Sequence, residues 1–166
     1  PPLTHHEALG LNVAIIGGTG GIGRALARTL ASEGAQVTVV GQTFRDADQA
    51  GIRFIQADLS LMREARRVAA ALPVGSLDLV VLTNGIFAAP RRQETAEGIE
   101  RDMAVSFLSR LAILQDIAPR LGSQRPAGRP KARVFVMGYP GTGQTGTLGD
   151  LNAERSYSAM ATHMNT

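Results

Sequence analysis

The sequence predicts a doubly wound α/β fold with a parallel sheet. Short runs rich in β-branched residues alternate with stretches of helical periodicity, which is typical of βαβ units. These runs are too apolar for a sheet with one solvent-exposed face, so helices are expected to cover both faces. About five strands with right-handed crossovers predict the strand order 3-2-1-4-5. The runs occupy residues 12–16, 36–40, 52–57, 77–82 and 132–137.

Three stretches between the strands have the spacing of amphipathic helices. The longest should cover about residues 95–121 and end at Gly122. Residues 1–10 are expected to form an N-terminal tail, and residues 11–166 one domain. The apolar positions that define the helices are Ile22, Leu26 and Leu30; Ala65, Val68, Ala69 and Leu72; and Ile99, Met103, Phe107, Leu111 and Leu114.

Composition narrows the class of protein. Of 166 residues, 44% are hydrophobic and 19% charged, which is typical of a globular protein. Seventeen cations against 14 anions give a net charge of +3, and neither a nucleic-acid-reading motif nor a membrane span accompanies them. The local excess of charge at residues 122–133 predicts a solvated loop. The absence of cysteine excludes disulfides and suits a reducing, cytoplasmic compartment, and no metal site is predicted.

A glycine-rich loop, "IIGGTGGIGR" (residues 15–24), follows the first predicted strand and opens the first helix. Gly17, Gly21 and Gly23 stand where the backbone must turn, approach a pyrophosphate and let helix meet strand. Thr19 and Ile22 belong to the same loop. Because the helix N-terminus offers free N–H groups and a positive dipole end, this context predicts a dinucleotide-phosphate site.

The spacing G-x-x-x-G-I-G resembles that of the short-chain dehydrogenase/reductase family. Further stretches resemble the family in collinear order, from about residue 11 to the end of the chain. They are "QADLS" (56–60), "LDLVVLTNGIFAAP" (77–90), "RVFVMGYPG" (133–141) and "DLNAERSYSAMA" (150–161), the last being similar to retinol-dehydrogenase-like members.

The resemblance implies a Rossmann-like sheet that binds NAD or NADP and transfers a hydride to or from a small carbonyl or alcohol. It assigns Asp58 and the adjacent Leu59 to the adenine end, and Asn84 and Gly85 to the nicotinamide ribose. The apolar segment "NGIFAAP" (84–90) favours a hydrophobic substrate. The family's strands 6 and 7 have no counterpart in this sequence, and the 95–121 helix is expected at a homo-oligomer interface.

The choice between NAD and NADP depends on the end of the second strand. An acid there would favour NAD by binding the ribose 2′-hydroxyl. The sequence instead reads Gly41-Gln42-Thr43, with no acid until Asp46. Arg45 lies close enough in sequence to meet a 2′-phosphate, with Arg24 as a second cation, so NADP is favoured. Gln42 is expected to line the same site.

The family's catalytic unit is degenerate in this sequence. The family uses a tyrosine whose pKa is lowered by a lysine, together with a serine and an asparagine. By the resemblance the asparagine position holds Ser106, the serine position Tyr139 and the tyrosine position His163, while Tyr157 matches an earlier, non-catalytic tyrosine. The lysine position falls one residue past Thr166.

The only lysine, Lys131, precedes the fifth strand, so it is expected at the opposite edge of the sheet. Two hypotheses therefore stay open. Either Tyr139, Tyr157 and His163 form an atypical proton-transfer site, or the chain is a non-catalytic dinucleotide-binding module or a fragment.

Overall fold

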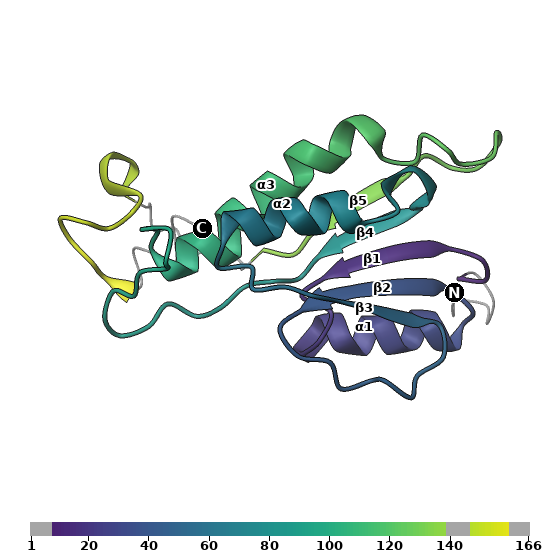
Figure 1. Cartoon of the computed structure of the whole chain (residues 1–166), viewed down its shortest axis with the longest axis horizontal. Helices are drawn as coiled ribbons and strands as arrows, with labels where there is room; N and C mark the ends of the chain where they lie inside the picture. The colour runs from purple at the N-terminus through teal and green to yellow at the C-terminus, as the bar shows by residue number, and fades with distance from the viewer. Residues whose placement is uncertain (1–7, 139–146, 160–166) are drawn as a thin grey trace.

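The computed structural model describes residues 8–138 and 147–159. Its five strands form one parallel sheet in the order β3-β2-β1-β4-β5, which confirms the predicted fold (Figure 1). No helix in the described part of the chain is long and apolar enough to cross a lipid bilayer. The strands are β1 (Asn12–Ile16), β2 (Gln36–Gly41), β3 (Ile52–Gln56), β4 (Leu79–Leu82) and β5 (Arg133–Val136).

The helices lie on both faces of this sheet, as its apolar strands require. Figure 1 shows α1 (Gly21–Ser32) on one face and α2 (Met62–Ala71) with α3 (Ser109–Ile117) on the other. A π-helical segment, η2 (Met103–Leu108), runs directly into α3. Three short 3₁₀ turns complete the described elements: η1 (Val74–Ser76), η3 (Ala118–Arg120) and η4 (Leu148–Asp150).

The central strand β1 divides the core into two layers because successive side chains point to opposite faces. Val13 and Ile15 pack in the cluster on the α1 side, whereas Ala14 and Ile16 pack with α2 and α3. All four are fully buried. Ala8, within the predicted N-terminal tail, is also buried in the layer on the α1 side.

The long helix differs from the prediction at its start. Helical structure begins at Arg101 rather than at residue 95, since Glu94 and Glu100 form an isolated antiparallel bridge. Thr95 closes the intervening turn, its backbone N–H donating to Ile99 O at 2.9 Å. At the other end α3 passes into η3, and Gly122 adopts a φ of +69°, which suits its predicted role as terminator.

The predicted apolar face of the long helix is wrong in part. Phe107 and Leu111 are each 40% exposed, whereas Ala112, Ile113 and Ile117 are buried against the sheet and α2. A π-helical turn holds more residues than the 3.6 of an α-helix, so positions counted at α-helical spacing drift around the axis.

Strand β5 is the exposed margin of the sheet. It pairs with β4, and no other strand among the described residues pairs with it. Val134, Phe135 and Val136 are 39%, 53% and 55% exposed. An apolar strand of this kind is a ready surface for further packing.

The basic segment after α3 is more than a solvated loop, which corrects that expectation. The side chain of Arg125 is only 9% exposed, and its Nε donates to Asp78 Oδ1 at 2.7 Å. The Asp78 carboxylate also accepts from the backbone N–H of Asn12 at 2.9 Å, and Arg129 lies 3.5 Å from it. Asp78 therefore ties this segment to the starts of β1 and β4.

We predict that Asp78→Ala destabilises the chain by about 3 kcal/mol, because it leaves the Arg125 guanidinium buried without its anion. Urea unfolding followed by circular dichroism measures this change. The matched control is Asp48→Ala, at an exposed acid, which should change stability by less than about 0.5 kcal/mol. Equal effects of the two substitutions would contradict the proposed anchoring.

Candidate functional site

The glycine-rich loop between β1 and α1 packs directly on the end of β4. Gly17 adopts a φ of +89°, and a Cβ on it would lie 2.5 Å from the backbone nitrogen of Asn84. A Cβ on Gly23 would lie 2.4 Å from Thr83 Oγ1, whose hydroxyl donates to Ile16 O at 3.0 Å. Only glycine fits at these two positions, so the loop is held against β4 with its other side open.

A cleft of about 1060 Å³ lies over this loop, at the carboxyl ends of the strands. The N-terminus of α1 opens into it without a side-chain cap and without an acid in the first turn. Ile22 is 65% exposed in spite of its helical spacing because it lines the cleft. All the residues predicted to bind the cofactor line this one cleft: Gly17, Thr19, Gly21, Ile22, Gly23, Gln42, Arg45, Asp58, Leu59, Asn84 and Gly85.

The end of the cleft beside β2 and β3 is polar. Asp58 accepts hydrogen bonds from the Ser60 backbone N–H at 3.0 Å and from Gln42 Nε2 at 3.2 Å. Although burial raises it, these hydrogen bonds and the charge of Arg101 leave the pKa of Asp58 lowered. A carboxylate fixed at this edge can accept a hydrogen bond from an amino group of a ligand.

The first acid after β2, Asp46, is buried and is not among the residues that line the cleft. It accepts from Arg24 through two hydrogen bonds of 2.8 and 2.7 Å and from Arg28 at 2.8 Å. Hydrogen bonding to Arg24 is the main cause that lowers the pKa of Asp46 to about 2. Because the ion pair occupies Arg24, the structure does not support its predicted role as second cation, and Arg45 is the arginine near β2 that lines the cleft.

The opposite end of the cleft is built on Asn84 and Arg110. The Asn84 side chain donates to Val105 O in the π-helical segment at 2.7 Å and to Ser109 Oγ at 3.0 Å. Arg110 donates through Nε to Asn84 O and through Nη1 to Met137 O, each at 2.8 Å. This guanidinium joins the ends of β4 and β5, and its burial lowers its pKa.

Arg110 also lines the cleft, although it is not among the site residues predicted from the sequence. The available signal was an arginine four residues after Ser106, inside the otherwise apolar stretch "FLSRLAIL". Such a cation within an apolar helical stretch needs partners, which are the two main-chain carbonyls.

The predicted catalytic residues fall in different places. Ser106 is buried, lines the cleft, donates to Asp102 Oδ1 at 2.6 Å and accepts from the Ile86 N–H at 3.1 Å. Tyr157 is not among the residues lining the cleft, and its hydroxyl donates to Ala89 O. Tyr139 and His163 lie outside the described residues.

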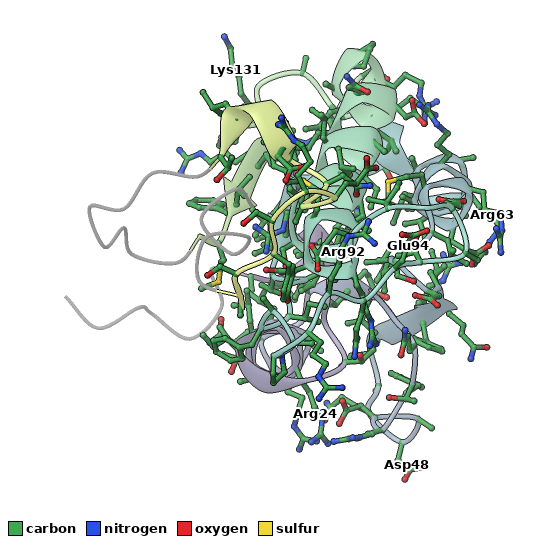
Figure 2. All side chains as sticks on the ribbon, turned by 90° about the vertical axis from the view of Figure 1, so that its left-hand side faces the viewer. Arg24, Asp48, Arg63, Arg92, Glu94 and Lys131 are labelled. Carbon is green, nitrogen blue, oxygen red and sulfur yellow. The ribbon has the colours of Figure 1, made fainter. Side chains whose placement is uncertain are left out.

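The environment of Tyr157 is unlike that of a proton-transfer tyrosine. Burial is the main cause that raises its pKa, and the nearby carboxylates of Glu100 and Asp102 raise it further. An acid–base phenol needs the opposite shift, which a neighbouring cation would supply. Lys131 precedes β5, and Figure 2 shows it at the top of the view, whereas Arg24, in the helix that the glycine loop opens, lies in the lower part.

Comparison with known proteins identifies the family. The model of the short chain dehydrogenase family matches residues 11–129, so the chain belongs to that family. It is 54% identical over 159 residues to an uncharacterized oxidoreductase of Saccharomyces cerevisiae, covering 93% of this chain and 52% of the relative. It is 32% identical over 167 residues to polyprenol dehydrogenase of Mus musculus, covering 91% of this chain and 49% of the relative. The chain thus spans about half the length of these curated relatives.

Solved structures share the fold. An NADH-dependent reductase in complex with NAD aligns with a TM-score of 0.66 and 23% identity, over 97% of this chain and 68% of the reductase. The active-site complex of RhlG with NADP, from Pseudomonas aeruginosa, aligns with a TM-score of 0.62 and 26% identity, over 95% of this chain and 62% of that chain.

We predict that the Asp46 ion pairs stabilise the chain only where the carboxylate is ionised. Its folded pKa is depressed, so the contribution is present above about pH 4 and is lost as the pH falls toward 2. Melting temperatures of the unaltered chain and of Asp46→Asn should differ at pH 6, and the difference should close between pH 4 and 2. A difference that stays constant over this range would contradict the prediction.

Proposed function

We propose that this chain binds NAD(P) in the cleft at the carboxyl edge of its sheet. The observation that carries the proposal is that the glycine loop, the ends of β2 and β3 and the end of β4 open into that one cleft. The loop fits a pyrophosphate because glycine at its crowded positions keeps side chains out and α1 offers uncapped N–H groups. A reductase that shares the fold is known in complex with NAD, which supports dinucleotide binding by this chain.

The whole protein is proposed to be a short-chain dehydrogenase-type oxidoreductase acting on a small carbonyl or alcohol. The bound nicotinamide would donate or accept the hydride. Phe87 and Ile86 line the cleft beside Gly85, and Phe87 is 85% exposed, which supports an apolar substrate. Domain limits of 11–166 and a cytoplasmic location remain predictions.

A non-catalytic dinucleotide-binding module is the alternative for this chain alone, and two observations favour it. Ser106 is engaged with Asp102, and the raised pKa of Tyr157 opposes proton transfer at neutral pH. Under the catalytic hypothesis Tyr139 and His163 would supply the proton transfer, and His163→Ala would abolish turnover without changing cofactor affinity.

A homo-oligomer interface is also proposed on the long helix. The exposed side chains of Phe107 and Leu111 on that helix support it.

The primary test is titration of the 166-residue chain with NADH and NADPH, followed by cofactor fluorescence. Gly21→Asp should weaken both by a hundredfold or more, since like charges about 4 Å apart cost roughly 4 kcal/mol at an effective dielectric of about 20. Gly21 has a φ of +49°, which aspartate tolerates, and open space where a Cβ would lie.

Gly128→Asp is the matched control. Gly128 also has a positive φ, +86°, and open space, but it lies outside the cleft. Its substitution should leave cofactor affinity unchanged. A folded chain that binds neither dinucleotide, or that binds both equally well after Gly21→Asp, would contradict the proposal.

NADP is proposed as the preferred cofactor because Arg45 lines the cleft and Asp46 is bound to Arg24 and Arg28. Arg45→Ala should weaken NADPH about tenfold and NADH less than twofold, since the guanidinium would pair with the additional phosphate. Arg53→Ala, at an exposed arginine on β3, serves as the control. Equal loss for both cofactors after Arg45→Ala would remove the basis for the preference.

A further inference from the structure

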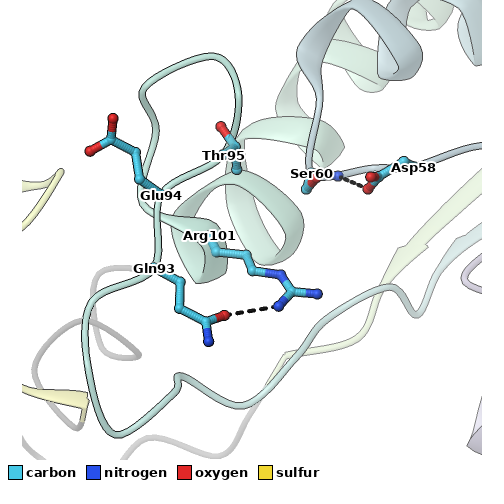
Figure 3. Close-up of a pocket in the computed structure, with 6 residues that line it drawn as sticks. All are labelled: Asp58, Ser60, Gln93, Glu94, Thr95 and Arg101. Atoms are coloured by element: carbon cyan, nitrogen blue, oxygen red, sulfur yellow. Dashed lines mark hydrogen bonds between the residues drawn. The ribbon is translucent and has the colours of Figure 1, made fainter.

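A second hollow, of about 530 Å³, adjoins the cleft at its Asp58 end. Asp58, Ser60 and Arg101 line both spaces, so the hollow and the cleft adjoin at these three residues. Figure 3 shows Arg101 between Gln93 on one side and the Asp58–Ser60 segment on the other. The hollow therefore lies next to the cleft, beyond the end of β3.

Arg101 is held in place at this junction. Its Nη1 donates to Gln93 Oε1 at 2.8 Å, and its backbone N–H donates to Gln93 O at 2.9 Å. Gln93 therefore fixes both the first residue of the helical segment and the direction of its guanidinium. The remaining N–H groups of a guanidinium with five donors stay available to a ligand.

The Arg101 guanidinium and the Asp58 carboxylate thus line the same space without forming an ion pair in the described part of the chain. Asp58 accepts from Ser60 and Gln42, and among the described residues it forms no ion pair with Arg101. The two groups nevertheless interact electrostatically. A ligand group that donates toward Asp58 and accepts from Arg101 would bridge them.

Apolar walls lie next to this donor–acceptor pair. Leu59 and Val105 line the cleft together with Arg101. Flat aromatic rings suit such walls. The Glu94 carboxylate also lines the hollow, but it is ion-paired with Arg92. One anion, Asp58, and one cation, Arg101, therefore face a ligand here, and this balance of charge favours a neutral ring over a further phosphate.

We infer that Arg101, held by Gln93, is a specificity residue for the adenine base. Asp58 accepts from the exocyclic amino group, Arg101 donates to a ring nitrogen, and Leu59 with Val105 flank the ring. The inference rests on the proposed dinucleotide binding and assigns to the base site a residue from the helical segment after β4. The adenine end is then closed by groups from two different crossovers.

The experiment compares three probes on the 166-residue chain: NADH, ADP-ribose and reduced nicotinamide mononucleotide. Arg101→Met should weaken NADH and ADP-ribose by the same factor, about tenfold, which is the size expected for one charge-assisted hydrogen bond at a partly exposed site. The mononucleotide has a phosphate but no adenine, so its affinity should change less than twofold. Gln93→Leu should give a smaller loss with the same pattern, because it frees the guanidinium without removing it.

Controls separate base recognition from general attraction of anions. Arg53→Met removes an exposed arginine outside both spaces and should leave all three affinities unchanged. Since Arg101 is exposed, its substitution should leave the melting temperature unchanged. Equal losses for the mononucleotide and NADH, or no loss for NADH, would overturn the inference while leaving the proposed function intact. Failure of the unaltered chain to bind either NADH or NADPH would overturn both.

Discussion

The contact between the glycine loop and the end of β4 is the constraint on which the cleft depends. A side chain at Gly17 or Gly23 would collide with Asn84 or Thr83, so the backbone of the loop lies where a side chain would otherwise be. This close approach sets the entry of α1 and leaves its N-terminus facing the carboxyl edge of the sheet. Because β1 is central, that edge is also where the ends of β2 and β4 flank the loop (Figure 1). The close contact of Gly17 and Gly23 with the end of β4 thus positions the glycine loop, the N-terminus of α1 and the end of β4 relative to one another.

Charge is distributed unequally along the cleft. Near β2 and β3 the charged groups Arg45, Asp58 and Arg101 are exposed or partly exposed, as suits the polar half of a dinucleotide. At the other end Arg110 is committed to the carbonyls of Asn84 and Met137. Its hydrogen bonds to both carbonyls stiffen the junction of β4 and β5. The two ends therefore differ. The charged groups near β2 and β3 are accessible to a ligand, whereas Arg110 at the other end is hydrogen-bonded within the protein.

The sheet and the outline of the cleft were predictable from sequence because both follow from local pattern. Strand periodicity gave the order of elements, and glycines between a strand and a helix located the loop. The interior of the long helix was not predictable in this way, since a π-helical turn has no periodic signature and moved Phe107 and Leu111 outward. The burial of Arg125 was also not predictable from its basic sequence neighbours, because its partner Asp78 lies 47 positions away in the chain. Long-range pairing of this kind is invisible to local composition.

The wide turn at Met103–Leu108 has a consequence for insertions and deletions in this chain. A π-helical turn is equivalent to an α-helix that has gained a residue while its flanking turns keep their faces. Loss of one residue there would leave α3 packed on α2 but would redraw the surroundings of Val105 O, which accepts from Asn84 and Ser109. The extra residue therefore affects the hydrogen bonds beside the cleft more than the packing of α3 on α2. The number of residues in this segment is therefore constrained by the geometry of the cleft, independently of which residue types occupy it.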